Sequence, residues 1–291
     1  MEIRHHIRTA IWGIISLLTF MSCHYDPVPE SEKELVVEGW IAEGQFPIVF
    51  VTSTLPIKKQ NTYLDSLGQF VAQWARVEVQ TDNDTVVLTG MYNSKYFPPY
   101  IFTSNRMRGV SGKHYRLIVD WSGLHAEATT SIPSFVALDS LWTEPVSDND
   151  TLRQLCAGFF DASPQHDHYL LFSRRISDYL NPQLCIFGLL DDAVVDSGSE
   201  SKQMYTLHLR RGHQLDTDQD YVPYYSIGDT VLVTLEHVDS ISFAFWRTFE
   251  DNRILSGYHF LPIANPLKGN IQGGHGVWYG CTQSTRSIVI P

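Results

Sequence analysis

Short runs of alternating apolar and polar residues occupy most of the chain between Glu34 and Pro133. Alternation with a period of two predicts β-strands that bury one face. The first two strands are expected at residues 35–41 and 48–51, with Glu43-Gly44 as a turn between them. Because helical periods are rare here, residues 34–133 predict an antiparallel sandwich of the immunoglobulin or transthyretin type.

Two further pairs of runs predict β-hairpins, because short turn sequences separate their strands. Asp, Asn and Gly tolerate the left-handed backbone that tight turns require. The first hairpin joins residues 76–81 to 85–91 across Asp82-Asn83-Asp84, and the second joins residues 114–121 to 124–132 across Ser122-Gly123.

Residues 134–291 predict a second β-rich domain that contains one amphipathic helix. The strands are expected at residues 155–160, 169–176, 204–209, 230–236 and 287–290. The helix is expected near residues 239–252, where Ile241, Phe245, Trp246 and Phe249 recur at helical spacing and Asp239 or Ser240 is placed to cap the free amides. Its aromatic stripe favours packing on a sheet, with a cofactor pocket as the alternative.

The first 22 residues have the order of a lipoprotein signal peptide. Arg4 and Arg8 precede an apolar run over residues 11–21, and Ser22 then presents Cys23 for cleavage and lipidation. The run is shorter than the roughly 20 residues of a membrane-spanning helix. We therefore expect a lipid anchor on Cys23 and a flexible tether over residues 23–33, with secretion of an unmodified cysteine as the alternative.

The charge of the chain excludes some partners. The full sequence has a net charge of -11; without Arg4, Arg8 and Glu2 the mature chain has 19 basic and 31 acidic residues, which gives -12. This acidic balance argues against nucleic acid and against binding to anionic lipid surfaces. We expect attached acyl chains to hold the protein at the membrane.

Three cysteines follow Cys23, so at most one disulfide can form among them. Cys156 and Cys185 fall in neighbouring predicted strands and are the preferred pair. Three reduced, buried thiols are the alternative, because cysteine packs as a small apolar residue.

Enzyme motifs are absent from the sequence: it contains no G-x-S-x-G, H-E-x-x-H, P-loop or dinucleotide fingerprint. We therefore expect no catalytic residues and no cofactor. Asp216, Asp218 and Asp220 alternate as at the start of a calcium loop, but Tyr221 and Ile227 replace its glycine and glutamate, so a solvated acidic loop is favoured.

Four histidines are weak metal candidates. His166 and His168 share a face if their segment is extended, but two ligands do not make a site, so an exposed loop is favoured. His208 and His213 have no better claim.

Two tyrosine-rich segments suggest a contact surface. Tyr96, Phe97 and Tyr100 surround Pro98-Pro99, and Tyr224 with Tyr225 follow Pro223. Exposed rings on a loop bury a large area at small entropic cost, which suits contact with a protein or a sugar. Burial of the same rings against the sandwich is the equal alternative.

Several sequence motifs, in order, resemble the Bacteroidota lipoprotein family called domain of unknown function 4249. They are Leu35-Val36-Val37-Glu38-Gly39-Trp40-Ile41, Ala128-Thr129-Thr130-Ser131-Ile132-Pro133, Gly228-Asp229-Thr230-Val231, Asn265-Pro266, Asn270-Ile271-Gln272-Gly273-Gly274 and Gly276-Val277-Trp278. The resemblance implies an outer-membrane lipoprotein that assists a TonB-dependent receptor, and it supplies no known catalytic residue.

The resemblance favours a binding or accessory subunit of an uptake system. A structural envelope-assembly or adhesion lipoprotein is one alternative, and a surface hydrolase is another. Asp26, Glu30 and Glu32 resemble a surface-export signal of Bacteroidota lipoproteins, so cell-surface and periplasmic positions both stay open.

Overall fold

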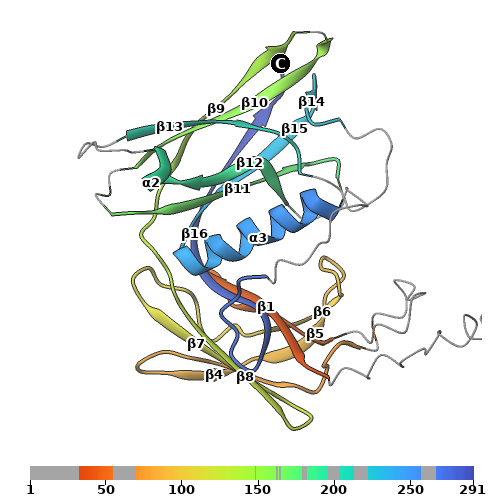
Figure 1. Ribbon diagram of the computed structural model, residues 1–291, viewed down its shortest axis with the longest axis vertical. Coiled ribbons are helices and arrows are strands. Elements are labelled where there is room, and N and C mark those ends of the chain that lie inside the picture. The colour runs from red at the N-terminus through yellow and green to blue at the C-terminus, as the bar shows by residue number, and fades with distance from the viewer. Residues whose placement is uncertain are drawn as a thin grey trace, which may run out of the picture. The chain divides into compact units, whose positions relative to one another are not determined.

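Strand β1 (Leu35–Ala42) lies between two strands that are far apart in the sequence. It pairs antiparallel with β2 (Ile48–Ser53) and parallel with β16 (Gly274–Val289), where Leu35 faces Gly274 and Ala42 faces Cys281. In the computed structural model these strands form the middle of an eight-stranded sheet in the order β12-β11-β15-β16-β1-β2-β6-β5 (Figure 1). The main sheet therefore contains strands from both halves of the chain.

The structure describes residues 33–54, 68, 70–147, 149–161, 163, 165–178, 182–195, 203–212, 222–256 and 267–291. The predicted signal peptide, Cys23, nearly all of the tether, His213 and the three aspartates Asp216, Asp218 and Asp220 lie outside these residues. The remaining strands of the main sheet are β5 (Thr89–Tyr92), β6 (Tyr100–Thr103), β11 (His168–Arg175), β12 (Gln183–Asp191) and β15 (Thr230–Val238).

A first smaller sheet packs on the half of the main sheet that contains β1, β2 and β6. It has the order β4-β3-β7-β8, formed by β3 (Arg76–Gln80), β4 (Thr85–Val87), β7 (His114–Trp121) and β8 (Leu124–Ser131). Alternate residues of β1, Val37 and Ile41, enter the core between these sheets with Leu117. Trp278 of β16 is also buried there, and its indole donates a hydrogen bond to the carbonyl of Tyr115 at 3.2 Å.

A second smaller sheet packs on the other end of the same main-sheet face. It contains β9 (Leu138–Val146), β10 (Asn149–Asp161), β13 (Gln203–Leu209) and β14 (Tyr225–Ser226). Val231, Val233 and Leu235 of β15 meet Leu155 and Phe159 of β10 in its core. The apolar alternation of each strand thus explains which face it buries.

Helix α3 (Ser240–Ser256) packs against the opposite face of the main sheet, near β11 and β16 (Figure 1). Asp239 caps it, because its carboxylate accepts the backbone N–H of Ser242 at 2.7 Å. Phe243 and Phe245 are buried against Leu170 and Val277. A second, four-residue helix is α2 (Asp192–Val195). Of the predicted stripe, Phe245 is buried on the sheet and Trp246 packs beside it, whereas Ile241 and Phe249 are exposed, so the expected packing holds for only part of the stripe.

The mostly β fold with sandwich-like sheets is confirmed, and several local details differ from expectation. Residues 85–91 form two strands rather than one, because the chain leaves β4 at Leu88 and then pairs as β5 with β6. The glycine-rich stretch after Gly273 is part of the 16-residue β16, which is far longer than the expected last strand. β6, β9 and β14 were not predicted, and the strand expected around Cys185 is β12.

The predicted disulfide between Cys156 and Cys185 is wrong, because both residues and Cys281 are free and buried. Cys185 faces the core between the main sheet and the second smaller sheet. Leu155 and Ala157 of β10 point into that core, so the intervening Cys156 points to the opposite side. The alternative of three reduced, buried thiols agrees with the structure.

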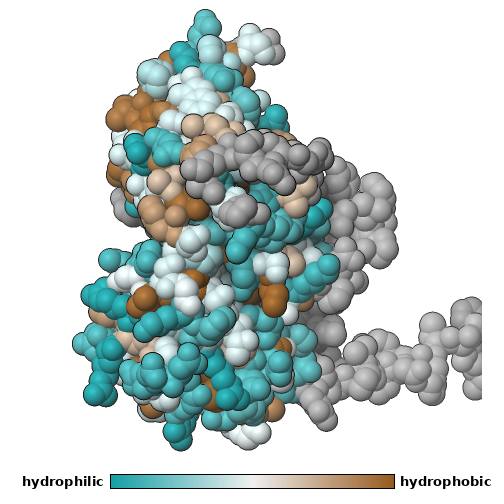
Figure 2. Space-filling view, turned by 90° about the vertical axis from the view of Figure 1, so that its left-hand side faces the viewer, coloured by the Kyte–Doolittle hydropathy of each residue, from teal (hydrophilic) through white to brown (hydrophobic). Residues whose placement is uncertain are grey.

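The face seen in Figure 2 is mainly hydrophilic, and its apolar side chains form small separate patches. Such scattered apolar residues are ordinary on protein surfaces. Among the described residues, no helix is both long and apolar enough to cross a membrane.

Two glycines with positive φ provide a matched test of the β1–β16 pairing. A Cβ on Gly276 (φ 113°) would lie 1.9 Å from the carbonyl oxygen of Val37, whereas Gly228 (φ 89°) has open space around it. We expect Gly228→Ala to cost about 1–3 kcal/mol of unfolding free energy through backbone strain alone. Gly276→Ala should cost more than about 4 kcal/mol or prevent folding. Urea denaturation measures both, and equal losses would contradict the role assigned to Gly276.

Candidate functional site

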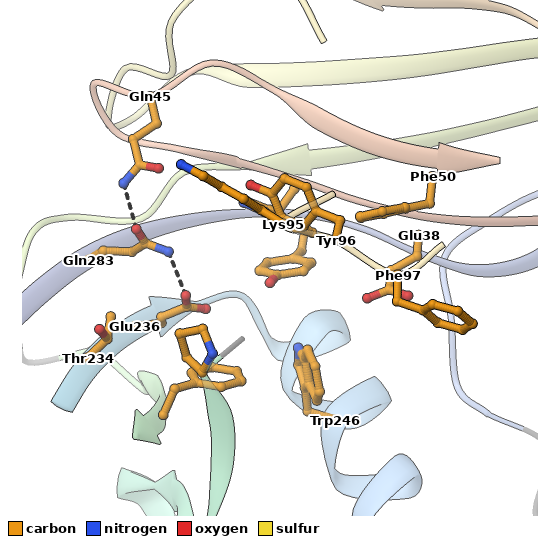
Figure 3. Close-up of a pocket in the computed structure, with 14 residues that line it drawn as sticks. Glu38, Gln45, Phe50, Lys95, Tyr96, Phe97, Thr234, Glu236, Trp246 and Gln283 are labelled. Atoms are coloured by element: carbon orange, nitrogen blue, oxygen red, sulfur yellow. Dashed lines mark hydrogen bonds between the residues drawn. The ribbon is translucent and has the colours of Figure 1, made fainter. Parts of the chain in front are cut away.

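A pocket of about 420 Å³ opens on the face of the main sheet that carries α3 (Figure 3). Its residues come from β1, β2, β11, β15, β16 and α3, from the turn between β1 and β2, from the loop between β5 and β6, and from Pro182 just before β12. The pocket therefore draws on both halves of the sequence.

Strand register explains why polar and aromatic side chains meet here. Glu38 is paired with Phe50, Trp40 with Tyr279, and Glu236 with Gln283. Directly paired residues project from the same face of a sheet. The intervening residues, such as Val37 and Leu235, enter the two sandwich cores on the other face.

Aromatic rings form much of the pocket surface. The ring of Trp40 lies 6.0 Å from Phe50, 6.2 Å from Tyr96 and 6.3 Å from Tyr279, measured between centroids. Across the pocket, Trp246 of α3 packs edge-on against Phe172 at 5.4 Å. Figure 3 shows Lys95 and Tyr96 on one side of the pocket and Trp246 on the other. A ligand in the pocket therefore meets rings from two sides.

A chain of hydrogen bonds ends at Glu236. Gln45 donates to the Oε1 of Gln283 at 2.7 Å, and Gln283 donates to the Oε1 of Glu236 at 2.6 Å (Figure 3). The Oε2 of Glu236 is buried and has no hydrogen-bond partner among the described residues. Glu236 is only 6% exposed, and burial raises the pKa of its carboxyl to about 7, although the bond from Gln283 acts in the opposite direction.

Two more polar groups face the pocket. Glu38 is accessible from the pocket, but the surrounding protein desolvates its carboxylate and raises its pKa. The indole N–H of Trp246 is buried and has no hydrogen-bond partner within the described part of the chain. The pocket thus combines apolar rings, one unpartnered acceptor and one unpartnered donor.

The residues predicted to contact a partner differ in their exposure and in their place in the fold. Tyr96 and Phe97 line the pocket, with Phe97 62% exposed. Tyr100 is half-buried, and its hydroxyl donates to the carbonyl of Gln73. Tyr224 is half-buried beside Arg210.

Tyr225 is a wrong prediction as a contact residue, because it is 1% exposed and its hydroxyl donates to Ser173 in the second core. The strand register between Arg153 and Tyr225 places this ring inside the sandwich.

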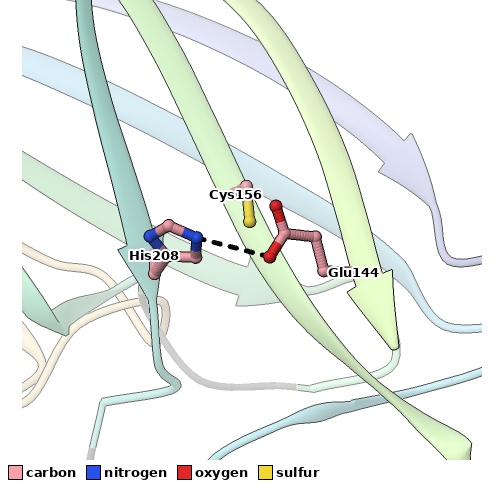
Figure 4. A group of neighbouring side chains, drawn as sticks. All are labelled: Glu144, Cys156 and His208. Carbon is pink, nitrogen blue, oxygen red and sulfur yellow. Dashed lines mark ion pairs between the residues drawn. The ribbon is translucent and has the colours of Figure 1, made fainter. Parts of the chain in front are cut away.

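Glu144, Cys156 and His208 meet on the outer face of the second smaller sheet (Figure 4). His208 and Glu144 already form an ion pair at 3.3 Å, and both are exposed. Burial, followed by the charge of Glu144, raises the pKa of the Cys156 thiol to about 12. This thiol is therefore protonated at neutral pH, which makes the trio a weak metal site.

His166 and His168 do share a location, and the structure adds a third residue that the sequence did not indicate. Asp191, at the end of β12, lies beside them because β12 pairs with β11. Glu38, Glu236 and Gln283 were also missed. The available signal was a carboxylate inside an otherwise apolar strand, as in residues 35–42 and 230–238.

The architecture and the pocket define a mostly β protein with a cavity on its largest sheet. A family model described as "Domain of unknown function (DUF4249)" matches residues 24–287. The chain belongs to this family, which confirms that part of the resemblance found in its motifs. No curated protein is significantly similar to the chain.

The buried carboxyl of Glu236 should make stability depend on pH. Its pKa rises from 4.5 to about 7 on folding, so between these values the folded protein holds a proton that the unfolded chain releases. Stability from this group is therefore greatest below pH 4.5 and falls as the pH rises through 7, by on the order of 3 kcal/mol. Glu236→Gln should lack this loss and exceed the wild type in stability at pH 8.

Urea denaturation at pH 4.5, 6 and 8 measures this difference. The same substitution at the exposed Glu43 is the control, because Glu43 lies outside the pocket lining. Parallel pH profiles for Glu236→Gln and the wild type would show that the carboxyl does not titrate in this range.

Proposed function

We propose that the pocket binds a small ligand rich in hydroxyl groups, of which a sugar is the simplest example. The observation that carries this proposal is the pair of unpartnered groups, Glu236 Oε2 and Trp246 Nε1, between aromatic rings. Leaving a buried polar group without a partner costs about 1–3 kcal/mol, and the hydroxyl groups of a ligand can donate to the carboxylate oxygen and accept from the indole N–H.

The chemistry of the pocket favours such a ligand over a purely apolar one. Sugar rings have apolar C–H faces that cover aromatic side chains, and their hydroxyl groups point outward to polar partners. The volume of about 420 Å³ is within the range of about 300–1,000 Å³ that is common for ligand sites. Lys95 and Gln45 add polar groups at the rim.

The proposed setting is the outer membrane, with the protein held by lipid on Cys23. In this setting it acts as an accessory subunit of a TonB-dependent uptake system and passes its ligand to the transporter. The signal-like N-terminus and the motif resemblance support this role. The alternative is a structural or adhesive role in the envelope, which requires no ligand in the pocket.

A second candidate function is hydrolysis of the same class of ligand. Glu38 and Glu236 both face the pocket and both have raised pKa values. Glycoside hydrolysis commonly uses two carboxyl groups, one of which must keep its proton near neutral pH. Binding remains the first proposal, because the unpartnered indole N–H indicates recognition and has no role in acid–base chemistry.

Trp246→Phe tests ligand binding, because it removes the indole N–H and keeps an aromatic ring. We expect about a 10-fold weaker affinity for the best ligand of an oligosaccharide panel, since one hydrogen bond contributes about 0.5–1.5 kcal/mol. Calorimetry measures the affinity. Trp74→Phe is the matched control, because Trp74 is 91% exposed and does not line the pocket.

The same panel separates the candidate functions. Saturable binding without product formation supports a binding protein, whereas turnover that is lost in Glu236→Gln supports a hydrolase. Unchanged affinity in Trp246→Phe would contradict the proposed role of the indole. A panel with neither binding nor turnover would favour the structural alternative.

The accessory role predicts a stable complex in the membrane. Gentle detergent extraction followed by affinity purification should recover a TonB-dependent transporter with the wild-type protein. Replacing Tyr96 and Phe97 together with alanine should reduce the recovered transporter at least about 10-fold with little loss of melting temperature, because Phe97 is 62% exposed and Tyr96 is half-buried in the pocket lining rather than in a core. A large loss of melting temperature would instead assign both rings to folding, and recovery of other envelope machinery would favour the structural role.

A further inference from the structure

Three potential ligand side chains converge where β11 begins and β12 ends. His168 is the first residue of β11 and is paired with Asp191, the last residue of β12, while His166 precedes β11 by two positions. Their nearest nitrogen and oxygen atoms all lie within 4.8 Å of one another. The Nε2 of His166 is 2.6 Å from the Oδ1 of Asp191 and 3.8 Å from the Oδ1 of Asp192.

The imidazole of His168 is the least accessible member of this group. It is 8% exposed and lies between the rings of His166 and Phe243, with centroid distances of 4.4 and 4.9 Å. Within the described residues it makes no hydrogen bond. An imidazole that makes no hydrogen bond can bind an ion through a ring nitrogen.

A second layer of carboxylates lies next to these three residues. Asp161, Asp167 and Asp192 are buried, and their oxygen atoms also come within 4.8 Å of one another. Asp192 accepts the backbone N–H of Asp167, and Asp161 accepts the hydroxyl of Tyr169. Asp167 pairs with His237 through Oδ1, but its Oδ2 is buried without a hydrogen-bond partner in the described part of the chain.

The charge of this region is unbalanced. Four carboxyl groups lie here, at residues 161, 167, 191 and 192, and among the described residues their ion-pair partners are imidazoles alone, with no lysine or arginine. Burying several carboxylates together without a cation is costly.

We propose that His166, His168 and Asp191 bind a divalent transition-metal ion of the zinc class, with Asp192 next to the open coordination position. Two imidazoles and one carboxylate are a common ligand set for such ions, and three protein ligands leave one position for water. Bond lengths of about 2.0–2.2 Å in a tetrahedral site place ligand atoms about 3.3 Å apart, so the His166–Asp191 pair only has to open slightly. The metal supplies the positive charge that the carboxylates lack.

The full chain, extracted in detergent and stripped with a chelator, tests this proposal by titration with Co²⁺ and by Zn²⁺ competition against a chromophoric chelator. We expect one ion per chain, with cobalt spectra that lack a thiolate charge-transfer band. Asp191→Asn keeps the size of the side chain and its hydrogen bond to His166, yet it should weaken binding at least about 100-fold. His168→Ala should do the same.

Two control variants make the result specific. Glu34→Gln alters an exposed His–carboxylate pair with the same 2.6 Å separation, between His275 and Glu34, and should leave metal affinity unchanged. Cys156→Ser removes the thiol of the trio in Figure 4 and should also have no effect. Circular dichroism confirms that each variant is folded.

Three results would overturn the proposal. They are the absence of saturable binding by the wild type, full affinity in folded Asp191→Asn, and loss of binding in Cys156→Ser together with a thiolate band in the wild type. Because the readout is metal binding alone, failure here does not affect the ligand proposed for the aromatic pocket.

Discussion

The parallel pairing of β1 with β16 is the contact on which the rest of the structure depends. Eight consecutive residue pairs join the two strands, and Gly276 allows a close approach that a side chain would block. The first half of β16 places Trp278 in one sandwich core, and its second half pairs with β15 along the other core. Both sandwiches therefore share one sheet, in which β16 joins the β15 side to the β1 side.

The shared sheet also explains the position of the pocket. One face of the sheet is used by the two hydrophobic cores, so polar residues at alternate positions of the same strands must project from the other face. Glu38 and Glu236 are such residues, and α3 and the loop before β6 place aromatic rings in the same pocket lining, where Glu236 is buried and Glu38 stays exposed. Keeping a carboxyl such as Glu236 buried lowers stability at neutral pH, which is typical of groups retained for binding or chemistry.

Local features of this fold were predictable from the sequence, and long-range pairings were not. The alternation in residues 35–41, the Asp82-Asn83-Asp84 turn and the cap at Asp239 depend on neighbouring residues, and each agrees with the structure. Three other features depend on the register between distant strands. They are the pocket, the position of Asp191 beside His166 and His168, and the side of the sheet to which Cys156 points. Tyr225 shows the same limit: a tyrosine-rich segment with one proline indicated an exposed loop, but Tyr225 and Ser226 form β14 and the ring of Tyr225 is buried.

The order in which the chain is made has a consequence for how it reaches this fold. Leu35 pairs with Gly274, so the first strand waits for a partner made near the end of synthesis. Closing a loop of this length costs conformational entropy before any stabilising contact offsets that cost. Folds with such distant contacts therefore form slowly. The early hairpins can form as they emerge, but the core around Trp278 stays open until the last segment arrives. During that interval the chain exposes strand edges that invite association with other chains, so this protein should depend on chaperones that cover its N-terminal half.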